Sequence, residues 1–150
     1  MIHLTRQVEC KSEYIPSEAD LFAWVNYAMQ NSAIDYDLCI RLVEPEEIQT
    51  LNKTYRHKDK PTNVLSFPFD MEGIELDRPI LGDLVICPVV LEKEALEQDK
   101  TLEAHWAHIV IHGTLHLLGY DHENEDDANI MEQLEIDILK KIGYDNPYED

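Results

Sequence analysis

Three histidines within eleven residues carry the clearest chemical signal in this sequence. His112, His116 and His122 lie in the run HGTLHLLGYDH. The first two are four residues apart, a spacing that puts both imidazoles on one face of a helix. Gly119 is well placed to end that helix, because glycine readily adopts the left-handed conformation of a C-terminal cap. The chain can then bring His122 back toward the other two histidines, so the spacing predicts three nitrogen ligands around one metal ion.

Three histidine ligands are typical of a catalytic zinc site. Catalytic sites leave a fourth position open, whereas structural sites usually close with four ligands rich in cysteine. The three cysteines, Cys10, Cys39 and Cys87, are widely separated and form no paired motif. They predict free thiols in a reducing compartment. We therefore expect one Zn²⁺ per chain, although imidazole ligands would also accept nickel or copper.

Gly113 distinguishes this run from the zinc proteases that carry a His-Glu-x-x-His motif. In those enzymes the glutamate after the first histidine acts as general base. A glycine cannot accept a proton, so peptide hydrolysis is less favoured here. Three routes stay open: water activated by the metal alone, a carboxylate from elsewhere such as Asp121, or a nucleophile that belongs to the substrate.

The chain is strongly acidic, with 31 Asp and Glu residues against 12 Lys and Arg residues and a net charge of −19. Averaged over the surface, this charge repels nucleic acids and membranes. The basic residues are nevertheless concentrated, because Lys53, Arg56, Lys58 and Lys60 lie within eight positions. This cluster is either an anion-binding region or a solvated helix end and loop.

Hydrophobic periodicity predicts an α+β fold. A length of 150 residues suits one domain, and with the histidine run we expect residues 1–150 to form a single metal-dependent hydrolase domain. Strands are expected at 2–8, 38–42, 62–67 and 81–87, and helices at 16–30, from 45, from 89, at 102–118 and at 124–143. This order predicts a small mixed sheet of about four strands packed with about five helices, with the metal site at the end of a central helix. Without a long apolar run or a signal peptide, we expect a soluble, cytoplasmic protein with no membrane contact.

The expected central helix carries two further histidines on the same side. His105, His108, His112 and His116 follow one another at steps of three, four and four residues. Only the last two fit a triangle with His122. We interpret His105 and His108 as residues that line the groove or form hydrogen bonds in the core.

Three segments together resemble the YbeY family of bacterial rRNA maturation factors. They are LNKTYR (51–56) leading into PTNVLSFP (61–68), LGDLVI (81–86) and the histidine run (112–122). The resemblance implies a zinc-dependent, single-strand-specific endoribonuclease, with His112, His116 and His122 as metal ligands. It also implies that Arg56 is important for RNA cleavage. Many family members have aspartate at the position of Asn63. Because asparagine is not an acid or a base, this chain would lack any acid-base role that the aspartate has.

The chemistry of individual residues supports the same site. The planar guanidinium of Arg56 can hold two phosphate oxygens and stabilise charge in a transition state. Asp121 is a catalytic candidate that could orient an imidazole, or alternatively cap backbone amides in a turn. Lys58 and Ser66 are candidates for substrate binding, with packing as the alternative for Ser66.

The sequence therefore predicts a zinc-dependent endoribonuclease that acts on single-stranded RNA, and not on DNA. The family resemblance implies 16S rRNA 3′-end maturation and ribosome quality control, with the rRNA precursor, the small ribosomal subunit and its associated proteins as partners. The attacking group could be water or a ribose 2′ hydroxyl. Two alternatives stay open: a metallopeptidase, and a non-catalytic ribosome assembly factor with a structural zinc.

Overall fold

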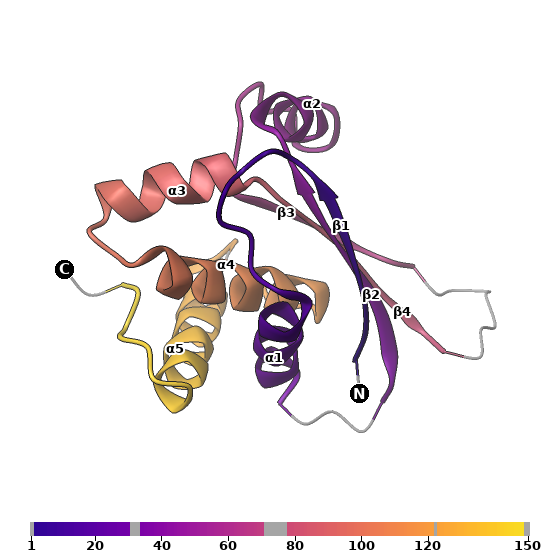
Figure 1. Cartoon of the computed structure of the whole chain (residues 1–150). Helices are drawn as coiled ribbons and strands as arrows, with labels where there is room; N and C mark the ends of the chain where they lie inside the picture. The colour runs from indigo at the N-terminus through magenta and orange to yellow at the C-terminus, as the bar shows by residue number, and fades with distance from the viewer. Residues whose placement is uncertain (1, 31–33, 71–77, 122, 149–150) are drawn as a thin grey trace.

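The computed structural model describes residues 2–30, 34–70, 78–121 and 123–148. In these residues the chain forms four strands and five helices (Figure 1). Their bounds are β1 Ile2–Glu9, α1 Glu18–Met29, β2 Tyr36–Val43, α2 Pro45–Arg56, β3 Val64–Pro68, β4 Ile80–Ile86, α3 Pro88–Glu97, α4 Leu102–Leu117 and α5 Glu125–Lys141. The predicted α+β class, with about four strands and five helices, is confirmed.

The strands form one mixed sheet in the order β1-β2-β4-β3. Strands β1, β2 and β4 are parallel, and β3 runs antiparallel to β4 at the edge. Gly82 lies beside a register shift in β4 and has a φ of +149°. A Cβ atom at this position would lie 2.3 Å from the carbonyl oxygen of Phe67. Only a glycine therefore allows β3 to pair this closely with β4.

The two faces of the sheet are covered differently (Figure 1). Helices α1 and α4 pack on one face, and α5 packs against α4. Leu38, Ile40 and Leu42 of β2 point into the main core on this side, as the two-residue repeat of a strand requires. A smaller cluster containing Ile48 of α2 and Val85 of β4 covers the other face. The sheet thus separates α2 from α4, and the two helices approach one groove from different sides.

Helix α4 is buried on most sides, with eleven of its sixteen residues in the interior. Thr101 caps its N-terminus by accepting a hydrogen bond from the amide of Ala104. At the other end, Gly119 has a φ of +102°, and its amide donates to the carbonyl of His116 at 3.0 Å. The amide of Tyr120 donates to the carbonyl of Leu115 at 3.1 Å, which completes a glycine-capped helix end. The predicted role of Gly119 as a helix cap is confirmed.

Gly113 lies where α4 touches the sheet. A Cβ atom here would lie 2.9 Å from Cδ2 of Leu84 and 3.3 Å from Cγ2 of Val64. The hydroxyl of Ser66 on β3 donates to the carbonyl of Gly113 at 3.0 Å. Position 113 therefore faces the strands, and a glutamate at this position would have to enter the core.

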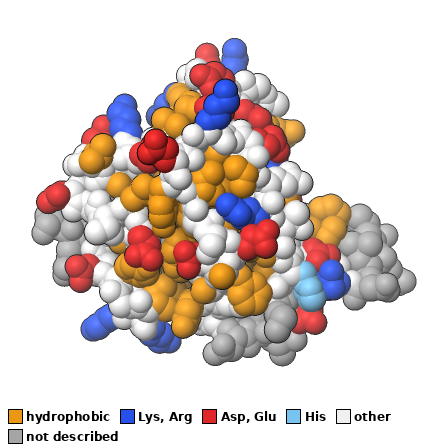
Figure 2. Space-filling view, in the orientation of Figure 1, with side chains coloured by type: hydrophobic (Ala, Val, Ile, Leu, Met, Phe, Trp, Pro, Cys, Tyr) orange, Lys and Arg blue, Asp and Glu red, His pale blue; other side chains and the backbone are white. Residues whose placement is uncertain are grey.

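One face of the molecule mixes basic and acidic side chains. On the face shown in Figure 2, basic side chains are scattered among acidic ones around exposed hydrophobic side chains. Among the described residues, no helix has the length and apolar character needed to cross a bilayer.

We expect Gly113→Glu to lower the free energy of unfolding by more than about 3 kcal/mol, because it buries an unpaired carboxylate and overpacks the contact between α4 and the sheet. Urea denaturation measures this change. Ile130→Glu is the matched control, since Ile130 is 59% exposed on helix α5 and should change stability by less than about 0.5 kcal/mol. Equal stability of the two variants would show that position 113 does not face the core.

Candidate metal centre and groove

A groove of about 740 Å³ brings together the ends of α2 and α4 and the edge strand β3. Five of the residues predicted from the sequence line this groove: Arg56, Ser66, His112, His116 and Asp121. Lys58 is exposed in the loop after α2 and is not part of the lining. His122 lies outside the described residues. The groove thus joins side chains from distant parts of the sequence, from Tyr55 to Glu123.

The imidazoles of His112 and His116 face each other, with their Nε2 atoms 3.1 Å apart. Their Nδ1 atoms each meet an oxygen: Nδ1 of His112 lies 2.5 Å from Oε1 of Glu135, and Nδ1 of His116 lies 3.1 Å from the carbonyl oxygen of Tyr120. Because both oxygens are acceptors, the protons of the neutral rings belong on Nδ1. With the protons placed in this way, the two Nε2 atoms are positioned as candidate ligands of one cation.

The spacing of these nitrogens fits zinc. Two nitrogen ligands at about 2.05 Å on a tetrahedral zinc ion lie about 3.3 Å apart, close to the observed separation of the Nε2 atoms. Histidine ligands also commonly donate their second N–H to a carboxylate or carbonyl oxygen, which fixes the tautomer and the ring orientation. His112 has a carboxylate in this place and His116 has a carbonyl. The donor set and the surrounding hydrogen bonds therefore suit one metal ion on the groove side of α4.

Glu135 of α5 is fully buried behind these rings. Burial alone would raise the pKa of its carboxyl group, but hydrogen bonds with His108, His112 and Tyr148 outweigh burial and lower the pKa to about 2. Burial also lowers the pKa of His108. Burial and the neighbouring carboxylate raise the pKa of the Tyr148 hydroxyl. At neutral pH the centre therefore holds a carboxylate that accepts hydrogen bonds, a neutral His108 and a tyrosine that donates.

A second donor group lies on this buried side of α4. His108, His112 and Glu135 each offer a ligand atom within 4.8 Å of the others, and this group could hold a metal ion. However, the Nδ1 atom of His112 and Oε1 of Glu135 are 2.5 Å apart, whereas two ligands of one tetrahedral ion at about 2 Å lie about 3.3 Å apart. The contact fits a shared proton better than a shared metal ion. We therefore favour the groove side of His112 as the metal position.

The sequence-based interpretation of the other two α4 histidines is borne out for His105. Its Nε2 forms a hydrogen bond with Oε1 of Glu94 at 3.0 Å, and the His105 side chain is buried. His108 was also expected to form hydrogen bonds, and its Nε2 lies 3.3 Å from the hydroxyl of Tyr148. The structure adds that His108 belongs to the second donor group, which the spacing argument did not anticipate.

Glu135 and Tyr148 were not identified from the sequence. Glu135 had a detectable signal, because it stands four residues from both Met131 and Leu139 on the buried face of α5. A charged residue in the apolar stripe of a helix is rarely buried without a partner. Tyr148 follows the last helix in an irregular segment, and no periodicity marks it.

Arg56 is the last residue of α2 and is held in place by the chain that follows it. His57 adopts a left-handed conformation with a φ of 60°, which ends the helix. The side chain of Asn52 is buried and donates to the carbonyl of Lys60 at 2.9 Å, so the loop folds back on α2. Within the described ranges no carboxylate forms an ion pair with Arg56, whereas Lys53 lies 3.9 Å from Asp59. The guanidinium is thus available to a ligand in the groove.

Asp121 and Asn63 line the groove, and both side chains form hydrogen bonds within the protein. Oδ1 of Asp121 accepts a hydrogen bond from the amide of Glu123 at 2.9 Å, which matches the turn-capping alternative. The imidazole of His116 is oriented by the carbonyl of Tyr120 instead. The side-chain amide of Asn63 donates to Glu94 at 3.2 Å. An aspartate in place of Asn63 would face another carboxylate, so this position serves here as a hydrogen-bond donor.

Comparison with known proteins adds two similarities. Residues 7–143 match the family model described as Endoribonuclease YbeY. The fold is similar to the solution structure of TM1509 from Thermotoga maritima, described as VT1, a NESGC target protein. The two share 24% sequence identity and a TM-score of 0.54, and the match covers 97% of each chain. This structural likeness shows a shared fold.

There are two candidate metal positions: one between His112 and His116 on the groove side, and one between His108, His112 and Glu135 on the buried side. They predict different effects of single substitutions on zinc affinity. We expect His116→Ala to weaken zinc binding by at least about 100-fold, because it removes one of the paired Nε2 atoms. His108→Ala should weaken binding by less than about 10-fold, because it changes only the support behind His112. Competition with a chromophoric chelator measures both dissociation constants. The reverse order of effects would place the metal ion between His108, His112 and Glu135.

Proposed function

The chain belongs to the YbeY family of endoribonucleases, and from this premise we propose that it is a zinc-dependent enzyme that cleaves single-stranded RNA. Its substrate would be the 3′ end of the 16S rRNA precursor, reached on the small ribosomal subunit in the cytoplasm, with a role in ribosome quality control. The observation that carries this proposal is the single groove that contains the paired imidazoles of His112 and His116 together with Arg56.

The residues of the groove suit the cleavage of a phosphodiester. Bound zinc would supply a Lewis acid that polarises the phosphate and lowers the pKa of a water molecule. His112, His116 and His122 would be its ligands. Arg56 would hold two phosphate oxygens and stabilise the negative charge that grows in the transition state. Asp121 would take or supply a proton in the same groove, and Ser66 and Lys58 would contact the RNA.

Exposed aromatic side chains support a single-stranded substrate. Tyr55 and Tyr120 line the groove from α2 and from the segment after α4, and they are 63% and 39% exposed. Phe67 also lines the groove and packs edge-on against Tyr55, with ring centroids 5.2 Å apart. Unpaired bases can stack on such rings, whereas the bases of a duplex are already stacked on one another.

The net charge of −19 has a consequence for RNA binding. The average field of the protein repels a polyanion, so the positive charges in the groove, Arg56 and a bound zinc ion, would attract the RNA only at short range. A ribosome or ribosomal protein that positions the RNA would overcome this repulsion. We therefore expect cleavage of ribosome-bound precursor to be faster than cleavage of the same RNA free in solution.

Gly113 argues against the metallopeptidase alternative. Position 113 lacks the glutamate base of a zinc protease, and it faces Leu84 and Val64 in the core, where a charged side chain would be buried. The assembly-factor alternative is addressed by experiment, because a structural zinc would support ribosome binding without cleavage.

We expect His116→Ala to abolish cleavage of a 3′-extended 16S rRNA precursor, because the variant loses one of the paired nitrogens that face the metal position. Cleavage is measured with metal-replete protein and small subunits. His3→Ala, on strand β1, is the matched control and should retain full activity. Equal cleavage by both variants would indicate a contaminating nuclease. Ribosome binding without cleavage by any form of the protein would favour the assembly factor.

We expect Tyr55→Ala and Tyr120→Ala each to weaken binding of a single-stranded RNA 12-mer by about 5- to 100-fold, which corresponds to the loss of one stacked base. The salt dependence of binding should stay unchanged in these variants. Arg56→Gln should instead reduce the slope of log affinity against log salt by about 0.7, because it loses one phosphate contact. Fluorescence anisotropy at several salt concentrations measures both quantities.

Tyr27→Ala serves as the control for this binding experiment. Tyr27 is 50% exposed on α1 and does not line the groove, so its removal should leave RNA affinity unchanged. A loss of affinity for duplex RNA as large as the loss for single-stranded RNA would contradict a stacking role.

A further inference from the structure

The carboxylate of Glu135 connects His112 to a residue outside the groove. Its Oε1 atom lies 2.5 Å from Nδ1 of His112, and its Oε2 atom accepts a hydrogen bond from the hydroxyl of Tyr148. The Glu135 side chain is fully buried. A buried carboxylate needs partners for both oxygens. Here Oε1 has His112, a metal-ligand candidate, with His108 at 3.6 Å, and Oε2 has Tyr148 of the segment after α5.

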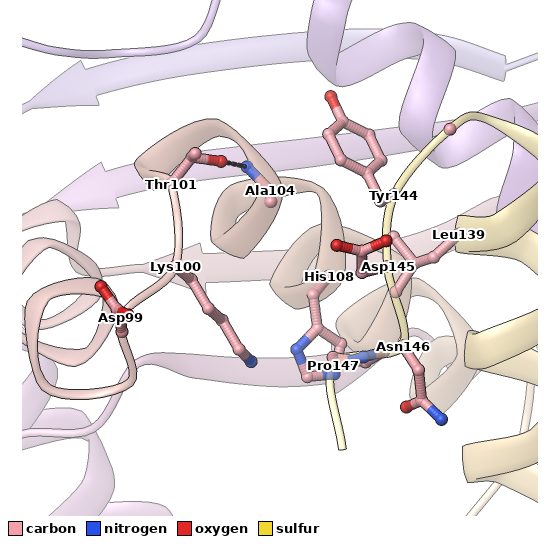
Figure 3. Close-up of a pocket in the computed structure, with 11 residues that line it drawn as sticks. Asp99, Lys100, Thr101, Ala104, His108, Leu139, Tyr144, Asp145, Asn146 and Pro147 are labelled. Carbon is pink, nitrogen blue, oxygen red and sulfur yellow. Dashed lines mark hydrogen bonds between the residues drawn. The ribbon is translucent and has the colours of Figure 1, made fainter. Parts of the chain in front are cut away.

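The segment 144–148 is folded back against α4 to reach this position. Gly143 has a φ of +93°, and the amide of Tyr144 donates to the carbonyl of Leu139 at 2.9 Å. The chain then passes along a cavity of about 290 Å³ into which His108 points (Figure 3). The side chain of Asn146 accepts from the amide of Tyr148 at 2.8 Å. These contacts direct the segment toward Glu135.

The ring of Tyr148 has a second contact on α4. It packs edge-on against His108, with ring centroids 5.4 Å apart and an interplanar angle of 83°. Tyr148 is nevertheless 44% exposed, so it contributes little buried area to the core. Its hydroxyl has a specific partner, whereas the rest of the ring is partly in solvent. If Tyr148 had only a structural role, its ring contact with His108 would matter most. If Tyr148 positions Glu135, the hydrogen bond of its hydroxyl to the carboxylate would matter most.

We propose that Tyr148 is a positioning residue for the metal centre, and that the segment 144–148 acts as a clamp on the buried side of α4. The hydroxyl of Tyr148 fixes the carboxylate of Glu135, and the carboxylate fixes the ring of His112, whose Nε2 faces the groove. Docking of the segment therefore raises zinc affinity on the opposite side of the helix. This inference rests on the proposed metal site of His112 and His116.

The test compares Tyr148→Phe with Tyr27→Phe in full-length, metal-free protein that is then titrated with zinc. Tyr148→Phe keeps the ring contact with His108 but removes the hydroxyl, which donates to Glu135 and lies 3.3 Å from Nε2 of His108. We expect zinc affinity to fall by about 3- to 10-fold, a smaller effect than the 10- to 100-fold typical of direct partners of metal ligands. The melting temperature of the metal-free protein should fall modestly, because Oε2 of Glu135 loses a hydrogen-bond donor, so the fall in zinc affinity is the readout that separates a positioning role from a structural one. Tyr27→Phe should change neither quantity.

Glu135→Gln provides a second, stronger variant. It keeps the shape of the side chain and an oxygen for His112 but removes the charge, so we expect zinc affinity to fall by about 10- to 100-fold. Unchanged zinc affinity in Tyr148→Phe, beside wild-type protein that binds zinc, would overturn the clamp and leave the proposed function intact. A lower melting temperature of the metal-free Tyr148→Phe variant with unchanged affinity would also overturn it. Wild-type protein that binds no zinc would refute the metal site itself.

Discussion

The close contact between α4 and the sheet is the constraint on which the candidate site depends. Gly113 lies against β3 and β4, where a Cβ atom would come within 2.9 Å of Cδ2 of Leu84 and force that side chain to move. This contact fixes the rotation of α4 about its axis. His112 and His116 consequently emerge at the groove, while His108 and one nitrogen of His112 face the buried carboxylate of Glu135. The packing of α4 against the sheet, with Gly113 at the contact, thus leaves one side of the helix at the groove and the other against Glu135.

Most of the fold could be predicted because its signals are local. Helices start beside the side-chain caps Ser17, Thr101 and Asn124. The alternating pattern of β2 arises because Leu38, Ile40 and Leu42 all point into the main core. The strand order could not be predicted in this way. Placing β4 between β2 and β3 depends on pairings between distant segments, and a hydrophobic pattern does not state which strands pair.

The candidate site was predicted only in part, because some of its signals are local and others depend on how the helices pack. The spacing of His112 and His116 is a property of one helix, so sequence reasoning found the pair. Glu135 reaches them from α5 and Tyr148 from the segment beyond it, and such contacts exist only after the helices have packed. Asp121 illustrates a different difficulty, because a carboxylate in a turn can serve an imidazole or a backbone amide, and in the structure it bonds the amide of Glu123.

The most direct test of this account is the position of the metal ion in crystals of the zinc-loaded protein, located by anomalous scattering at the zinc edge. The account predicts one peak in the groove, about 2.1 Å from the Nε2 atoms of both His112 and His116, with Glu135 bonded to Nδ1 of His112. A peak on the opposite side of the ring, with His108 and Glu135 as ligands, would contradict it.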